Sequence, residues 1–215
     1  MSEIGRYIPI AVISTKDCDF LIPRTGFARA WSCTNGLEIR INNNRYVHED
    51  LPKWQDRLKS LINAINGVNE LRGGVYLEIK RVGDLIGGLG IDWRNRGGYI
   101  SIEALNNIIK LATELGLRVI KYRGHPFIDV YPGGIQIDKS YAVVRLRELM
   151  GIRGPVMYMG DSENDIPAMK VVEYPIGIRH RYNEGLDLPV LLWVREDELP
   201  AFLGDLLSVL KSKVH

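Results

Sequence analysis

The most constraining stretch of the sequence covers residues 156–169, where a short apolar run stops at a glycine and is followed by closely spaced acids. The carboxylates are Asp161, Glu163 and Asp165, and Pro167 stands where a new helix begins. An apolar run of this length before a helix start is typical of a buried parallel strand. Ligands in open α/β sheets bind at the carboxyl ends of such strands. We therefore expect these acids at a ligand-binding edge of a parallel sheet.

The spacing of the acids has two interpretations. Acids crowded at one sheet edge repel one another, and a hard, oxygen-seeking cation such as Mg²⁺ would stabilise them. The same residues also form an ordinary helix start, because Asp and Ser cap helices and acids favour the positive end of the helix dipole. Spacing alone leaves both interpretations open.

The residue types at positions 160–169, Gly-Asp-Ser-Glu-Asn-Asp-Ile-Pro-Ala-Met, resemble the fourth motif of the haloacid-dehalogenase (HAD) superfamily of phosphohydrolases. The sugar-phosphatase branch is most similar, with its trehalose-phosphate, sucrose-phosphate, mannosyl-phosphoglycerate and Cof-type phosphatases. The resemblance implies an α/β fold, with a Rossmann-like parallel-sheet core and an inserted α/β cap domain. It also implies Asp161 as a direct Mg²⁺ ligand, Asp165 as a ligand or directly behind one, and Asn164 as an orienting residue.

Two further segments resemble motifs of the same superfamily. Residues 8–13 predict a strand, followed by Ser14 and Thr15, and by resemblance to the second motif these would bind a phosphate oxygen. A serine at a strand end also commonly satisfies only the backbone. Lys139 opens a predicted helix, where the helix dipole disfavours a cation, so we expect an anion nearby. By resemblance to the third motif, with Ser140 in place of the usual glycine, Lys139 would neutralise the phosphate and the attacking carboxylate.

The middle of the chain interleaves helical and strand patterns, which predicts a compact α/β subdomain rather than a linker. The Asn35-Gly36 turn resembles the segment at which these phosphatases leave the core for the cap. We expect a core of residues 1–36 and 133–215 and an inserted cap of residues 37–132. By resemblance to trehalose-phosphatase-like proteins, three polar cap positions would bind sugar hydroxyls: Asp92, Arg94 and Asp129. For Asp92 and Arg94 the alternative is a surface ion pair beside an aromatic residue.

The superfamily's attacking aspartate, in Asp-x-Asp-Gly-Thr at the end of the first core strand, has no match. The one Asp-x-Asp is Asp17-Cys18-Asp19, which no Gly-Thr follows and which lies three residues past Ser14. Four accounts stay open: Asp17 or Asp19 attacks, the missing strand lies upstream of Met1, another segment replaces it, or the protein is not an active hydrolase. Loss of a central strand predicts a gap in the sheet and uncovered apolar residues.

Composition limits the classes of partner. The net charge of +2 over 215 residues is too small to indicate nucleic acid. No apolar run is long enough to span a membrane, and the N-terminus lacks the layout of a signal peptide. Two cysteines make no disulfide framework, so we expect a cytoplasmic protein. The sequence carries no signal for an oligomeric state.

The leading hypothesis is a Mg²⁺-dependent phosphomonoester hydrolase acting on a small phosphorylated sugar or similar metabolite, with trehalose 6-phosphate as one candidate. The second is a catalytically inactive sugar-phosphate or metal-binding protein that lacks the nucleophile. A third, an α/β protein associated with nucleic acid, is disfavoured because acids are interspersed among its arginines. These are Arg72, Arg81, Arg94, Arg96 and Arg123.

Overall fold

The computed structural model describes residues 1–68, 74–94, 101–122 and 125–213. The chain divides into two compact units. The core unit comprises Met1–Tyr46 and Ile137–His215, and the insert unit comprises Val47–Gln136. The sequence-based division stood at 36/37 and 132/133. The unit boundary lies further along because the strand that follows residue 37 pairs with a core strand.

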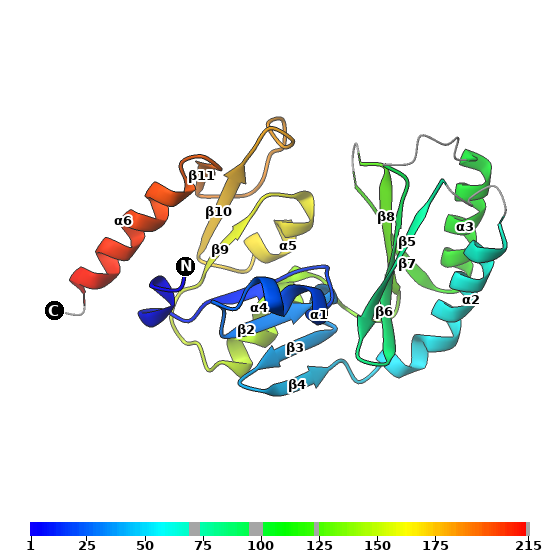
Figure 1. Ribbon diagram of the computed structural model, residues 1–215, viewed down its shortest axis with the longest axis horizontal. Helices are drawn as coiled ribbons and strands as arrows, with labels where there is room; N and C mark the ends of the chain where they lie inside the picture. The colour runs from blue at the N-terminus through cyan, green and yellow to red at the C-terminus, as the bar shows by residue number, and fades with distance from the viewer. Residues whose placement is uncertain (69–73, 95–100, 123–124, 214–215) are drawn as a thin grey trace. The chain divides into compact units, whose positions relative to one another are not determined.

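The first sheet of the core unit has four strands in the order β1-β2-β3-β4 (Figure 1). Strands β1 and β2 are parallel, and β3 runs antiparallel to β2. Their bounds are β1 Ala11–Ile13, β2 Ala30–Cys33, β3 Glu38–Ile41 and β4 Asn44–Val47. A short helix, α1 (Cys18–Leu21), lies between β1 and β2 along the chain.

The second sheet of the core unit has three parallel strands in the order β11-β10-β9. They are β9 Met157–Gly160, β10 Tyr174–Arg179 and β11 Leu192–Arg195. The helices of this half are α4 Lys139–Leu149, α5 Ile166–Met169 and α6 Leu199–Ser212. Helix α4 contacts β1 and β2 of the first sheet and also α5, so it connects the two halves of the unit.

A tight turn after β2 lets α4 approach the first sheet. Thr34 and Asn35 have positive φ angles of 51° and 57°, and Gly36 has a φ of 98°. A Cβ atom on Gly36 would lie 2.8 Å from the ring of Tyr141 on α4. Glycine therefore serves both the backbone conformation and the close packing of the helix.

The predicted interruption of the sheet is confirmed, because β1 and β9 are edge strands of two separate sheets. Successive residues of a strand direct their backbone groups to opposite sides. Ile10 and Ser14 bond to β2 and its flanks, so Ala11 and Ile13 face the open side of β1. Val156 bonds to β10, which likewise leaves the next residue, Met157, facing the open side of β9.

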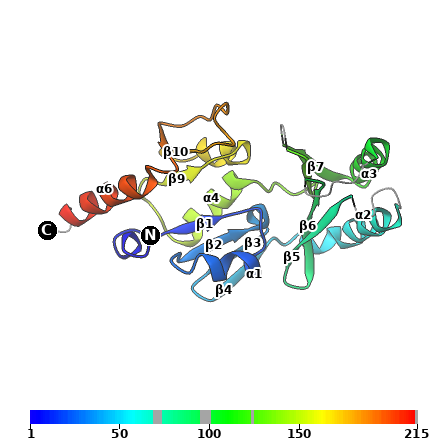
Figure 2. The ribbon, with the colours of Figure 1, turned by 45° about the horizontal axis from the view of Figure 1, so that its top comes forward.

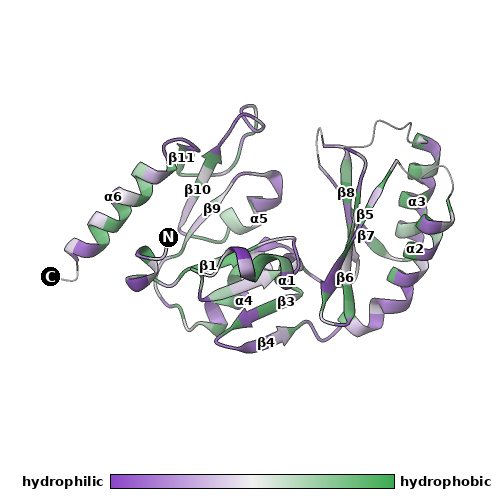
Figure 3. Cartoon of the chain, in the orientation of Figure 1, coloured by the Kyte–Doolittle hydropathy of each residue, from purple (hydrophilic) through white to green (hydrophobic). Residues whose placement is uncertain are grey.

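Helix α6 carries an apolar face that is only partly covered. It is amphipathic, yet none of its residues is buried (Figure 3). Its half-buried apolar stripe consists of Leu199, Phe202, Leu203, Leu206, Leu207 and Leu210. Such a stripe ordinarily packs against another element.

The insert unit is an antiparallel sheet with two helices on one face (Figure 1, Figure 2). Strand order is β5-β6-β8-β7. The strands are β5 Tyr76–Val82, β6 Leu85–Asp92, β7 Leu117–Lys121 and β8 Phe127–Pro132, and the helices are α2 Gln55–Gly67 and α3 Ile102–Glu114. Ser101 caps α3, because its hydroxyl accepts a hydrogen bond from the Ala104 N–H. The unit's apolar core lies between this face and the helices.

Short 3-10 helices complete the described secondary structure: η1 Ile4–Arg6, η2 Ile22–Arg24, η3 Thr34–Gly36, η4 Leu51–Trp54 and η6 Glu163–Asp165. None of the helices in the described ranges has both the length and the apolar character needed to cross a membrane. Of the arginines considered for nucleic-acid binding, three lie outside the described residues: Arg72, Arg96 and Arg123.

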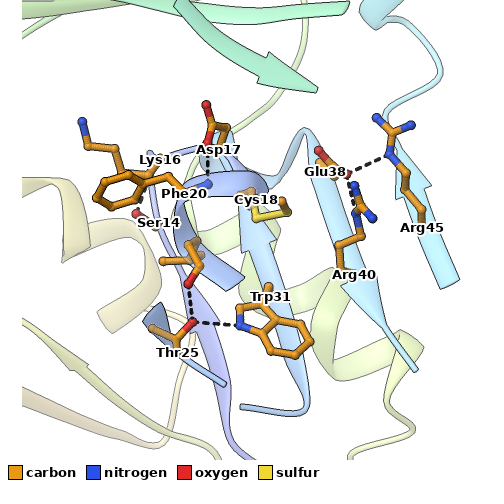
Figure 4. Close-up of a disulfide and its surroundings, with 12 residues drawn as sticks. Ser14, Lys16, Asp17, Cys18, Phe20, Thr25, Trp31, Glu38, Arg40 and Arg45 are labelled. Atoms are coloured by element: carbon orange, nitrogen blue, oxygen red, sulfur yellow. Dashed lines mark hydrogen bonds and ion pairs between the residues drawn. A yellow bond between two sulfur atoms is a disulfide. The ribbon is translucent and has the colours of Figure 1, made fainter. Parts of the chain in front are cut away.

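A disulfide joins Cys18 at the start of α1 to Cys33 at the end of β2 (Figure 4). The two cysteines had predicted a cytoplasmic protein without a disulfide framework. The fold brings the two Cα atoms to 5.3 Å, a distance that suits a disulfide. Both cysteines are buried, so this one covalent bond lies inside the small apolar cluster under α1.

Candidate functional site

The acidic turn begins where β9 ends, and Gly160 makes its tight geometry feasible. A Cβ atom at this position would lie 2.5 Å from Cγ of Asp165. Ser162 and Asp165 form a capping box around η6, in which each side chain accepts a hydrogen bond from the other's backbone N–H. The helix-start interpretation of these residues is therefore correct for Asp165 and Ser162.

Asp165 organises the whole turn. Its Oδ1 accepts hydrogen bonds from Nζ of Lys139 and from the hydroxyl of Tyr158, each at 2.5 Å. Its Oδ2 accepts from the N–H groups of Asp161 at 3.1 Å and Ser162 at 3.0 Å, and from the Ser162 hydroxyl at 2.8 Å. Both carboxylate oxygens are thus engaged, Oδ1 by residues of α4 and β9 and Oδ2 by groups of the turn.

The electrostatics of the buried Asp165 are set by these partners. Burial alone would raise the pKa of its carboxyl, but the positive charge and hydrogen bond of Lys139, with the hydrogen bonds from Tyr158 and Ser162, lower it below the ordinary value. Burial, and then the negative charge of Asp165, raise the pKa of Tyr158. Tyr158 therefore keeps its proton and acts as a donor.

Lys139 lies at a helix start, and the nearby anion expected there is Asp165. It is the first residue of α4, and Asp138 caps that helix by accepting from the N–H groups of Ser140 at 2.8 Å and Tyr141 at 3.0 Å. The side chain of Lys139 is only 11% exposed and forms an ion pair with Asp165. The pair ties α4 to the turn after β9.

Asp161 differs from Asp165 in being accessible. Its side chain is 55% exposed, and Oδ2 lies 3.0 Å from Nε2 of His180. Its backbone carbonyl accepts a hydrogen bond from Nδ2 of Asn183 at 2.7 Å. Asn164, between the two acids, is partly exposed. Of the two predicted metal ligands, Asp161 is therefore the one that is accessible to a ligand.

Sequence reasoning missed the loop that supports Asp161, residues 180–186. In the structure, the guanidinium of Arg179 stacks 3.4 Å from the ring centroid of Trp193. The same guanidinium donates to the carbonyls of Asn183, Glu184 and Leu186 at 2.5, 2.9 and 2.9 Å. The position of this loop in the chain could have indicated its role, because the loop follows a strand of the core unit, as the acidic turn does.

The residues after β1 form a second part of the core unit's site. The Ser14 hydroxyl accepts a hydrogen bond from the Lys16 N–H at 3.1 Å, which is the ordinary backbone role (Figure 4). Asp17 caps α1, because its Oδ1 accepts from the Phe20 N–H at 2.9 Å. Asp19 is exposed on α1.

The structure thus brings three of the predicted core residues together: Lys139, Asp161 and Asp165. Ser14 and Thr15 lie at the end of β1, against which α4 packs. Neither makes a hydrogen bond to that trio within the described part of the chain.

In the insert unit, Asp129 belongs to a buried polar cluster on β5 and β8. Its Oδ1 accepts from Nζ of Lys80 at 2.5 Å, and its Oδ2 accepts from the Tyr122 hydroxyl at 2.8 Å. Lys80 also donates to the Tyr131 hydroxyl at 2.9 Å. The neighbours of Asp129 on β8, Ile128 and Val130, point into the apolar core. The cluster therefore lies on the sheet face opposite α2 and α3.

Asp92 and Arg94 form the predicted ion pair beside an aromatic ring. The guanidinium of Arg94 donates to both carboxylate oxygens of Asp92, with a shortest distance of 2.5 Å, and lies 4.9 Å from the ring centroid of Phe127. A glycine of β6 allows a close approach of an aromatic ring. A Cβ atom on Gly88 would lie 2.7 Å from the Tyr131 ring.

A cation bound beside Asp161 would take most of its ligands from water and substrate rather than from side chains. Among the described residues, no group of three or more His, Cys, Asp or Glu side chains is placed to hold a metal ion. Mg²⁺, however, usually takes only one or two carboxylates and keeps water and substrate phosphate as its other ligands. The exposed Asp161 fits that pattern, whereas the oxygens of Asp165 are already hydrogen-bonded.

Comparison of the sequence with protein-family models and with curated proteins found no match. Solved structures do match. A trehalose-6-phosphate phosphatase related protein is 13% identical, with 99% of this chain and 86% of that chain covered and a TM-score of 0.72. The C-terminal domain of C. albicans trehalose-6-phosphate phosphatase is 15% identical, with coverages of 98% and 83% and a TM-score of 0.60.

A HAD subclass IIB sugar phosphatase is also similar, at 11% identity, with coverages of 93% and 87% and a TM-score of 0.59. At these identities the likeness concerns the fold. The chain has a HAD sugar-phosphatase-like α/β fold, which confirms the predicted fold class.

Proposed function

We propose that this protein is a Mg²⁺-dependent phosphomonoester hydrolase of the HAD type that acts on a small phosphorylated sugar. The observation that carries the proposal is the pairing of a nearly buried ammonium at the start of α4 with an accessible carboxylate on the turn after β9. Lys139 and Asp161 are held together through Asp165, which bonds to both. A phosphate ester and a cation need opposite charges at short range, and α4 and the turn together supply both.

Each residue has a defined part in the proposed reaction. Asp161 is the direct ligand of Mg²⁺, which screens charge between two anions when bound. Asp165 holds Lys139 and the backbone of the turn in place, and Asn164 orients the ligands. Lys139 stabilises the phosphoryl group as negative charge builds on its oxygens. Ser14 and Thr15 bind a phosphate oxygen.

In this proposal the cap comprises residues 37–132, which include most of the insert unit, and it selects the leaving group. Asp92, Arg94 and Asp129 provide the charged and hydrogen-bonding groups that bind sugar hydroxyls. The polar sheet face around Asp129 supports this assignment, because it carries side chains of both charges and two tyrosine hydroxyls. Trehalose 6-phosphate is the first substrate to test.

The attacking group separates this proposal from the second candidate function. Hydrolysis through an aspartyl-phosphate needs a carboxylate free to reach phosphorus. Asp17 is engaged as the cap of α1, and Asp165 is engaged by five hydrogen bonds. These contacts favour, as the alternative, a catalytically inactive protein that binds sugar phosphates or metal. The hydrolase proposal therefore needs a carboxylate of this chain other than Asp17 and Asp165 to attack phosphorus.

The test measures phosphate release from trehalose 6-phosphate and p-nitrophenyl phosphate with Mg²⁺, on the wild-type chain and on Asp17→Asn and Asp161→Asn variants. Turnover that Asp161→Asn abolishes and Asp17→Asn leaves intact is the result expected for the hydrolase. Absence of turnover with retained calorimetric binding of the sugar phosphate establishes the alternative. Loss of both activity and binding in the wild-type chain refutes the two candidates together.

A further inference from the structure

Strands β9 and β10 run parallel and end side by side, with Gly160 aligned to Gly177. The residues that follow each strand therefore emerge at the same sheet edge. Asp161 follows β9 directly, and His180 follows β10, which ends at Arg179. The topology alone thus places an imidazole beside the accessible carboxylate.

The hydrogen bonds of His180 define which ring nitrogen carries the proton. Nδ1 lies 3.2 Å from the backbone N–H of Tyr182, which donates to it. A nitrogen that accepts from an N–H holds no proton of its own, so in the neutral ring the proton is on Nε2. Nε2 then donates to Oδ2 of Asp161 at 3.0 Å. The imidazole therefore meets the carboxylate through an N–H group.

The loop that carries His180 is fixed at several points. Nδ2 of Asn183 donates to the carbonyls of Asp161 at 2.7 Å and Ile178 at 2.8 Å. Oδ1 of Asn183 accepts from the backbone N–H of His180 at 2.9 Å. Arg179 adds three bonds to carbonyls of the same loop. These hydrogen bonds fix the backbone of the loop, so the position from which His180 donates to Asp161 is fixed as well.

We propose that His180 is a positioning residue that fixes the rotation of the Asp161 carboxylate and leaves Oδ1 directed at the cation. The inference rests on the proposed function, because it takes Asp161 as the Mg²⁺ ligand. Groups that hydrogen-bond a metal ligand orient it, and their removal typically weakens metal binding by about 10- to 100-fold.

The test uses substitutions that separate the two ring nitrogens. His180→Gln keeps an N–H donor at the reach of Nε2, whereas His180→Asn keeps only a shorter group that can accept from Tyr182. His180→Ala removes both. Arg181→Ala is the matched control in the same loop, because the Arg181 side chain contacts Tyr182 and not Asp161. The Mg²⁺ affinity of each protein is measured by isothermal titration calorimetry, and its fold is checked by thermal unfolding.

We expect Mg²⁺ affinity to fall roughly tenfold or more in His180→Ala and His180→Asn, and to stay within about twofold of wild type in His180→Gln and Arg181→Ala. Equal affinities for His180→Gln and His180→Asn overturn the positioning role, because folding effects alone do not distinguish the two nitrogens. Equal affinities for wild type and Asp161→Asn refute the proposed metal ligand itself, and with it the function on which the inference depends.

Discussion

Replacing Lys139 by methionine tests the physical basis of the site. The substitution keeps the apolar stem but leaves the Asp165 carboxylate buried without its cation. The two side chains are 11% and 2% exposed, so solvent screens the pair weakly. Breaking a buried ion pair by removing one partner costs about 3–5 kcal/mol. Asp165 retains four other donors, so we expect the lower end, about 3 kcal/mol.

The assay is urea unfolding of the wild-type chain, Lys139→Met, Asp165→Asn and the double variant, followed by circular dichroism. In a chain of this size, about 3 kcal/mol corresponds to a fall in melting temperature of roughly 6–12 °C. The double variant also removes the unpaired carboxylate charge of Asp165, so it should be more stable than Lys139→Met alone. A double variant that is less stable than Lys139→Met, or a single variant within about 0.5 kcal/mol of wild type, would refute the reasoning.

Three further outcomes follow from the same structure. Because the pKa of Asp165 is lowered on folding, its ionic contacts stabilise the protein above its unfolded pKa, and this contribution is lost as pH falls through the folded value; acid unfolding of Asp165→Asn should lack that component. Reduction of the bond between Cys18 and Cys33, which are 15 residues apart, should lower unfolding free energy by about 3 kcal/mol, read by thermal unfolding with and without dithiothreitol; an unchanged melting temperature argues against the bond. Gly160→Ala should destabilise the core unit and displace Asp165, whereas Gly154→Ala, whose Cβ atom meets nothing within 4 Å, should be nearly neutral; similar losses in both would contradict the crowding described at Gly160.

The sequence predicted the part of the site that is local in the chain. Asp161 and Asp165 lie on one turn, and their spacing after an apolar run was sufficient to indicate a sheet edge. Lys139 was predicted from its charge at a helix start, where only a nearby anion stabilises it. The structure then supplied the specific anion, Asp165.

The support of Asp161 was not predictable from local pattern. His180 and Asn183 reach Asp161 only because β10 pairs with β9 in one particular register. Neither segment's sequence indicates which strand it will pair with. The disulfide was not predicted for the same reason, because Cys18 and Cys33 come together through the packing of α1 against β2. The core boundary lay beyond Gly36 because the hairpin of β3 and β4 extends the core sheet, a pairing that composition does not reveal.

The unpaired edges of β1 and β9 have a consequence for behaviour in solution. Amide protons directed away from a neighbouring strand exchange with deuterium as fast as local solvent allows, so those of Ala11 and Ile13 should be replaced well before that of Ser14, which bonds to Ser32. The same edges recruit any extended polypeptide that comes close. We therefore expect self-association through these edges to increase with protein concentration, as measured by analytical ultracentrifugation.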